Sequence, residues 1–145
     1  MKKAFLMAQP FYYIFAIIVI ALILFFGYNV INNLINLNEQ GKFVTFKSDL
    51  TKTVNDIYYK NPGSIIQYSK TSTHKPLLLP RDVKEVCFTS DGKVTAKSKY
   101  FQEFTVENLV PIVNCITTIN NELSFILENK IINNKIKVEI NEITS

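Results

Sequence analysis

The chain has 145 residues, a formal net charge of +4, 48% hydrophobic residues and 19% charged residues, which leaves room for one domain of ordinary size. Its 16 Lys and Arg residues are spread singly along the sequence apart from Lys2-Lys3, a pattern that argues against nucleic-acid binding. With one His and two Cys residues, and with no glycine-rich phosphate loop or nucleophile motif, we expect no enzyme activity, no metal site and no cofactor.

Residues 11–28 form the most apolar stretch of the sequence and contain no charged residue. At about 1.5 Å per residue an α-helix of this length spans roughly 27 Å, close to the thickness of a bilayer core. Tyr12, Tyr13 and Tyr28 lie at its two ends, where tyrosine rings favour the membrane interface. Pro10 suits the first turn of such a helix, because an amide donor there would be unpaired. The stretch predicts a transmembrane helix.

The flanking charges predict its orientation. Lys2 and Lys3 precede the span, whereas the next basic residue is Lys42, so the N-terminus is expected in the cytoplasm and the remainder outside the cell membrane. A cleaved secretory signal is the main alternative, but its apolar region is shorter and ends at a small-x-small site, which residues 27–32 lack. A buried core helix is the other alternative, and it would require protein on every face. We favour a single-pass, uncleaved anchor.

Residues 29–60 predict an amphipathic continuation of this helix to about Tyr59. Apolar residues recur mostly at steps of three and four: Val30, Leu34, Leu37, Phe43, Phe46, Leu50, Val54 and Ile57. Four charged residues fall at other positions and are expected to stay exposed: Lys47, Asp49, Lys52 and Asp56. We expect Phe43 and the apolar residues after it to be buried on a downstream sheet, with a coiled-coil or linker stalk as the alternative. Gly41 is a candidate position for a bend.

The sequence of residues 61–145 predicts a β-rich domain. Asn61-Pro62-Gly63-Ser64 ends the helix, and Ser90-Asp91-Gly92 marks a hairpin turn. Strands are expected at 64–69, 76–80, 83–89, 93–96, 123–128 and 136–140, with 107–117 as an edge strand or a loop because it contains Pro111. The Asn-rich stretch 129–134 is expected to connect the last two strands. The fold class is therefore α+β, with one long helix packed on a small, mainly antiparallel β domain.

Cys87 and Cys115 lie in expected strands or at their edges, in a compartment that permits oxidation if the orientation is right. We expect them to form a disulfide; two buried free thiols are the alternative. His74 lies in a polar run with no evident partner for a catalytic thiol. The glutamates of this region are scattered and form no recognisable acid–base pair.

The whole layout resembles the type IV pilin and pseudopilin family, especially its archaeal members: a basic head (residues 1–10), a membrane helix (11–28), its amphipathic extension (29–60) and a small β domain with a cysteine pair (61–145). In that family a membrane peptidase cuts after a small residue just before the apolar helix, and Ala8-Gln9 fits this pattern. Ala4-Phe5 is a second candidate for the processing site. Met7 stands where the family usually has a basic residue before the cut.

The resemblance implies that the chain is a structural, pilin-like subunit of a pilus or pseudopilus at the cell surface. Its expected partners are the lipid bilayer, other copies of itself or other pilin-like subunits, and a membrane prepilin peptidase. The helix residues expected to serve as lipid anchor or assembly core include Phe11, Tyr12, Tyr13, Ile17, Leu24 and Tyr28. The alternative is a monomeric, membrane-anchored binding module or assembly factor whose outer domain recognises an envelope partner.

Overall fold

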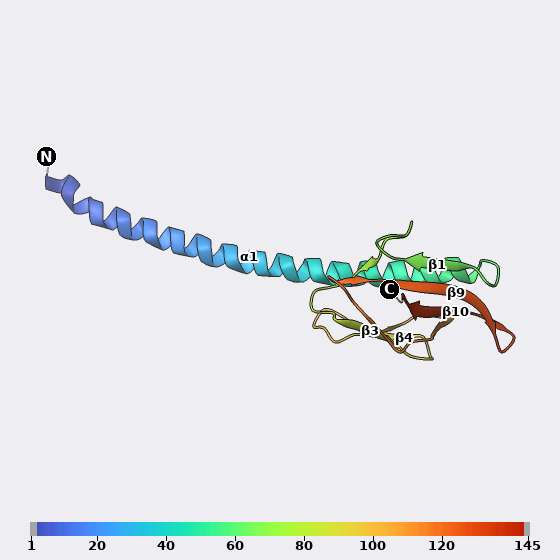
Figure 1. Ribbon diagram of the computed structural model, residues 1–145. Helices are drawn as coiled ribbons and strands as arrows, with labels where there is room; N and C mark the ends of the chain where they lie inside the picture. The colour runs from blue at the N-terminus through green and yellow to red at the C-terminus, as the bar shows by residue number, and fades with distance from the viewer. Residues whose placement is uncertain (1–2, 144–145) are drawn as a thin grey trace. The chain divides into compact units, whose positions relative to one another are not determined.

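The computed structural model describes the backbone of residues 3–143 and the side chains of residues 10–143. The candidate processing residues Ala4, Phe5, Ala8 and Gln9 therefore lie outside the residues whose side chains are described. The described chain contains one helix, α1 (Lys3–Tyr58), followed by short and long β-strands (Figure 1). This order confirms the α+β class. The chain divides into two compact units, the first ending at Asn38 and the second beginning at Glu39, and each is described by itself.

Helix α1 ends where the sequence predicts and begins earlier. Its last residue is Tyr58, just before the Asn61-Pro62-Gly63 segment, whereas it starts at Lys3 and includes Pro10 in its interior. The placement of Pro10 in the first turn is therefore wrong. A proline at this position removes one main-chain hydrogen bond of the helix.

The second unit contains all the strands. One four-stranded sheet has the order β1-β9-β10-β6, and it comprises β1 (Ile65–Tyr68), β9 (Phe125–Ile132), β10 (Lys135–Glu142) and β6 (Leu109–Pro111). A second sheet has the order β5-β4-β3-β7, and it comprises β5 (Phe104–Thr105), β4 (Lys93–Thr95), β3 (Glu85–Phe88) and β7 (Cys115–Thr117). A two-stranded pair joins β2 (Leu77–Leu78) and β8 (Glu122–Leu123). The ladders between these strands are antiparallel except that of β10 with β6.

Three strand assignments need correction. Residues 107–117 hold two strands rather than one, because β6 ends at Pro111 and β7 joins the other sheet. Residues 123–128 are likewise divided between β8 and β9. Strand β5 was not predicted, since two residues are too few to establish a period.

The Asn-rich stretch 129–134 is mostly strand, not connection. Strand β9 runs on to Ile132, and only Asn133 and Asn134 form the turn to β10, with φ of 51° and 60°. Both values are left-handed, as a two-residue hairpin turn requires, and asparagine tolerates this region better than most residues.

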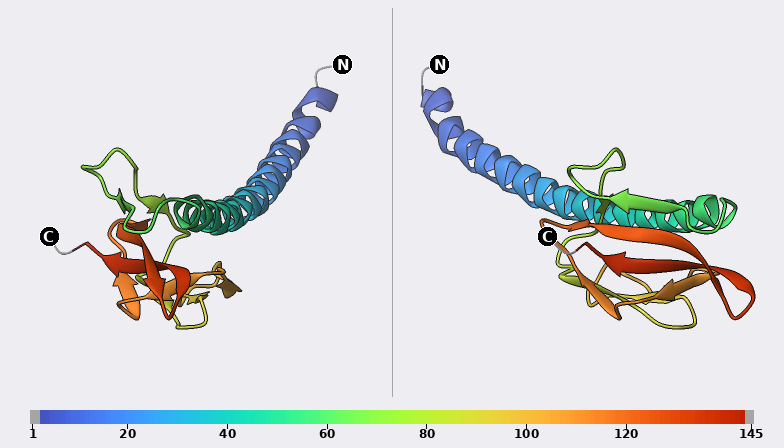
Figure 2. Two further views of the ribbon diagram at one scale, coloured as in Figure 1. Left: turned by 90° about the vertical axis from the view of Figure 1, so that its right-hand side faces the viewer. Right: turned by 45° about the vertical axis from the view of Figure 1, so that its right-hand side comes forward.

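The core of the second unit forms where α1 lies against the sheets (Figure 2). Phe46, Leu50, Val54 and Ile57 are at most 1% exposed, and they pack in one cluster with strand residues that include Leu127, Val138 and Ile140. Phe43 is partly buried against the same cluster. Lys47, Asp49, Lys52 and Asp56 are exposed. The predicted division of this part of the helix into a buried and a solvated side is confirmed.

Candidate interaction surface

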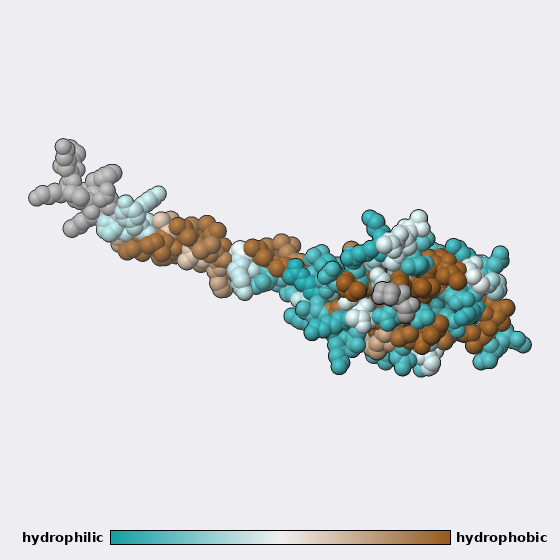
Figure 3. All heavy atoms as spheres, viewed as in Figure 1, coloured by the Kyte–Doolittle hydropathy of each residue, from teal (hydrophilic) through white to brown (hydrophobic). Residues whose placement is uncertain are grey.

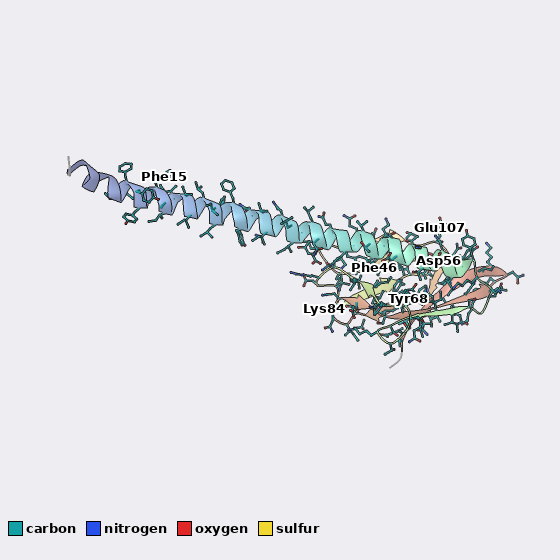
Figure 4. The ribbon with its side chains drawn as sticks, turned by 90° about the horizontal axis from the view of Figure 1, so that it is seen from above. Phe15, Phe46, Asp56, Tyr68, Lys84 and Glu107 are labelled. Atoms are coloured by element: carbon teal, nitrogen blue, oxygen red, sulfur yellow. A yellow bond between two sulfur atoms is a disulfide. The ribbon has the colours of Figure 1, made fainter. Side chains whose placement is uncertain are left out.

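The first unit exposes most of the apolar side chains that the structure describes there. The six residues proposed as anchor or assembly residues have exposed fractions of 65% to 80%: Phe11, Tyr12, Tyr13, Ile17, Leu24 and Tyr28. Helical spacing brings Tyr13, Ile17, Leu24 and Tyr28 to one side of α1, and places Phe11 and Tyr12 elsewhere on its circumference. Phe15, 66% exposed, projects from the same stretch (Figure 4).

This apolar surface belongs to a helix that is long and apolar enough to cross a membrane. Its best 18-residue window has a mean hydropathy of 2.8, and none of that window is buried. Hydrophobic side chains cover the face of this stretch that Figure 3 shows. The 35 residues from 4 to 38 contain no Lys, Arg, Asp, Glu or His. Exposed apolar area on this scale is characteristic of surfaces that contact lipid or other protein.

Cys87 and Cys115 form a disulfide, with an S–S distance of 2.10 Å. They are directly opposite each other in the antiparallel ladder between β3 and β7, so the bond joins the two strands across 28 residues of sequence. Glu85 lies beside them, and its carboxylate and the two sulfurs are within 4.8 Å of one another. Because both sulfurs are bonded to each other, this group offers no thiolate ligands to a metal ion.

Glu39, the first residue of the second unit, is a buried carboxylate with 0% exposure. Oε1 accepts a hydrogen bond from Lys42 Nζ at 2.9 Å, and Oε2 accepts one from the Arg81 backbone N–H at 2.6 Å. Arg81 Nε also lies 3.3 Å from Oε1. Burial raises the pKa of Glu39, but the two hydrogen bonds and the charges of Lys42 and Arg81 outweigh it and leave the pKa below its ordinary value. The cluster fixes α1 to the loop before β3.

Asn129, in β9, caps the C-terminal end of α1. Its side chain is fully buried, and Nδ2 donates to the carbonyl oxygens of Ile57, Tyr58 and Lys60 at 2.9, 3.2 and 2.7 Å. The last carbonyls of a helix have no partner within the helix, so this single amide supplies donors there, in addition to the Lys60 N–H that the Ile57 carbonyl also accepts at 3.0 Å. The sequence analysis missed this role, because the partners are about 70 residues away in sequence.

The described surface of the second unit has an open hollow along α1 near Gln102, with Asp56 as the one carboxylate among the residues that line it. Lys47 and Lys52 also line it, and neither His nor Cys belongs to this lining. His74 lies elsewhere, with its ring 5.2 Å from that of Tyr68. We take the exposed apolar part of α1, rather than this hollow, as the candidate functional surface.

Comparison of the chain with protein-family models, with curated proteins and with solved structures gives no match.

Proposed function

We propose that the chain is a structural subunit of a type IV pilus-like or pseudopilus-like surface assembly, held in the cell membrane by α1 before it assembles. One observation carries the proposal: the described part of α1 up to Leu37 exposes bulky apolar side chains, while the second unit has a closed core of its own. A subunit of this kind needs a helix that is stable first in the lipid bilayer and then in a dry bundle of similar helices.

The composition of α1 suits both surroundings. A helix satisfies its backbone hydrogen bonds internally, and residues 4–38 have no charged side chain. This part of the chain is therefore stable as a helix in lipid and equally in a dry bundle of similar helices. Uncharged residues 4–38 would measure about 52 Å as a helix, against about 30 Å for a bilayer core. The excess length favours a role beyond simple anchoring.

The second unit suits an extracytoplasmic position. Its disulfide is of a kind that persists in oxidising compartments, and the basic residues Lys2 and Lys3 precede the apolar helix, which favours a cytoplasmic N-terminus. In the proposed assembly the apolar helices form the dry centre and the disulfide-bonded domains form the outer layer.

Topology is tested with an impermeant maleimide on intact cells. Ser145→Cys is expected to be labelled without permeabilisation. The matched variant Lys2→Cys, combined with Ala8→Leu so that the first eight residues are kept, is expected to be labelled only after permeabilisation. Labelling of Lys2→Cys alone in intact cells would reverse the orientation and remove the proposal.

Assembly is tested by the intact mass of the chain from native membranes, together with a search for filaments that contain it. A chain that begins at Gln9 and occurs in filaments is the expected result. Ala8→Leu should block that processing, whereas Ala4→Leu should leave it unchanged. An intact Met1 terminus with a monomeric, filament-free protein would favour the membrane-anchored binding module instead.

A further inference from the structure

The solvent-facing side of the sheet that contains β3 and β7 carries two cysteines and a carboxylate side by side. Side chains along a strand alternate between the two faces of a sheet. Val86 and Phe88 of β3 are 0% and 2% exposed and belong to the core, so Glu85 and Cys87 project from the opposite face. Cys115 of β7 is directly opposite Cys87 and shares that face. The ladder therefore brings three candidate metal ligands together on one surface.

The backbone keeps the two cysteines adjacent without help from the disulfide. The Phe88 N–H donates to the Asn114 carbonyl at 2.7 Å, and Cys87 and Cys115 are the next pair along the ladder. Hydrogen-bonded and non-hydrogen-bonded pairs alternate in an antiparallel ladder, and side chains are closest at the non-hydrogen-bonded ones. The cysteines occupy such a pair, so their sulfurs remain neighbours when the bond between them is broken.

The distances suit a shared ion. The carboxylate of Glu85 and the two sulfurs lie within 4.8 Å of one another. In a tetrahedral zinc site with bonds of about 2.0–2.3 Å, a sulfur ligand lies about 3.5–3.8 Å from its neighbours. Glu85 is exposed and takes part in none of the ion pairs between described residues. Its carboxylate can therefore turn toward the sulfurs without breaking such a pair.

The donor set favours zinc over the other common ions. Thiolate sulfur is a soft ligand and carboxylate oxygen a hard one, and Zn²⁺ accepts both. Ca²⁺ and Mg²⁺ prefer oxygen ligands. Three protein ligands leave the fourth tetrahedral position to a water molecule. Both cysteines are half-buried and Glu85 is exposed, so a hydrated ion can reach the group from solvent.

We propose that the reduced form of the chain binds one Zn²⁺ ion through Cys87, Cys115 and Glu85, and that this ion delays formation of the disulfide. Both cysteines are thiols when the chain is made, because the cytoplasm is reducing. Zinc binding releases the two thiol protons to solvent, since the thiolate is the ligand. The site concerns the second unit alone, so it does not depend on membrane insertion or on assembly.

Oxidation of the pair removes the site. A small-molecule disulfide takes two electrons from the two thiolates and two protons from solvent, and becomes two thiols. The protein S–S bond forms and the ion leaves. The bound ion opposes this exchange because a metal-bound thiolate is not available to attack the disulfide.

The first test is a Cd²⁺ titration of the full chain in detergent after reduction by a water-soluble phosphine. The phosphine, one water molecule and the disulfide give phosphine oxide and two thiols, and no competing thiol is added. The reduced chain should show a thiolate-to-cadmium charge-transfer band that saturates at one ion per chain and that added Zn²⁺ abolishes. The oxidised chain should show no such band.

Two results of this titration would overturn the proposal. One is a reduced chain without the band. The other is a band that appears while the near-ultraviolet circular dichroism of the chain is lost in the presence of the metal, because the ligands would then belong to an unfolded chain.

Glu85→Gln tests the third ligand. A carboxamide is a poorer ligand than a carboxylate, so the Cd²⁺ affinity of the reduced chain should fall by about tenfold or more, as it does when even the outer partners of metal ligands are lost. Glu107→Gln is the matched control, because Glu107 is exposed and lies far from Lys84, the residue before Glu85 (Figure 4). Equal affinities of the two variants would refute the three-ligand site.

The rate of disulfide formation tests the effect of the ion. The reduced chain is treated with oxidised glutathione, and the loss of free thiols is followed with and without one equivalent of Zn²⁺. Zn²⁺ should slow the reaction by about tenfold or more, since it withholds the attacking thiolate, and Glu85→Gln should remove most of this effect. Equal rates with and without Zn²⁺ would overturn the proposal.

Discussion

The amide of Asn129 should be the most consequential polar group in the second unit. Asn129→Leu keeps a side chain of similar size and removes both N–H donors from the end of α1. The carbonyl of Ile57 still accepts the backbone N–H of Lys60 at 3.0 Å, whereas those of Tyr58 and Lys60 lose the Asn129 donor at partly buried positions. An unsatisfied buried carbonyl costs about 1–3 kcal/mol. Both affected carbonyls are only partly buried, and the substitution also removes the buried Oδ1 of Asn129, for which no hydrogen-bond partner is found among the described residues. We therefore expect a loss of roughly 1–3 kcal/mol in the free energy of unfolding.

The measurement is urea unfolding of the full chain in detergent, followed by the near-ultraviolet circular dichroism of its tyrosines, since the chain has no Trp. Asn114→Leu is the matched control, because Asn114 is exposed, and its effect should stay within about 0.5 kcal/mol. An Asn129→Leu chain that unfolds at the same urea concentration as the original would refute the capping argument.

Asn129→Asp adds a pH test of the same reasoning. An ionised carboxylate has no donor and meets the negative end of the helix dipole, so its pKa in the folded chain would be raised. A raised acid pKa means that the folded chain binds more protons, and stability then increases as the pH falls. The variant should therefore recover part of its lost stability between neutral pH and about pH 4, near the unfolded pKa of an Asp. Loss of stability over this range, relative to the original chain, would contradict the cap.

Three further predictions concern the same unit. Cys87→Ser and Cys115→Ser should each lower its unfolding free energy by about 3–4 kcal/mol, and the double variant should be no worse than either single one in the same urea titration. Leu50→Ala should cost about 2–4 kcal/mol, whereas Val44→Ala, at a position 63% exposed, should cost under about 0.5 kcal/mol. The pKa of Glu39 is lowered in the folded chain. Its ionised carboxylate therefore stabilises the folded chain above the ordinary glutamate pKa, and this stabilisation is lost as the pH falls through the pKa of the folded chain. Glu39→Gln should therefore flatten the acid side of the stability–pH profile, and an unchanged profile would contradict the cluster.

The features that the sequence predicted well are local or strongly periodic. The charged positions Lys47 and Asp56 alternate with a buried row that includes Leu50 and Val54, and a regular helix imposes that division on any partner sheet. The disulfide was also predictable, because the chain has two cysteines and no others with which they could pair. The hairpin turn at Gly92 is similarly local: its φ is 75°, and a Cβ there would collide with the Val106 carbonyl.

The features that were missed depend on groups distant in sequence. Asn129 reads as a loop residue because carboxamides favour turns, yet the carbonyls at the end of α1 give its amide three acceptors. Glu39 reads as a solvated carboxylate, since buried glutamates are rare unless paired, and its partner Arg81 lies 42 residues away. Neither distance can be read from periodicity or composition.

The error most relevant to function is the treatment of α1 as one continuous amphipathic stripe. Val30, Leu34 and Leu37 are 56% to 63% exposed, whereas Phe46 and Leu50 are buried. The sequence already contains the reason, because the step from Leu37 to Phe43 is six residues and breaks the spacing of three and four. Two rows separated by such a step belong to different sides of a helix, and they therefore need different partners. The sheets of the second unit cover the later row, whereas the earlier row is exposed.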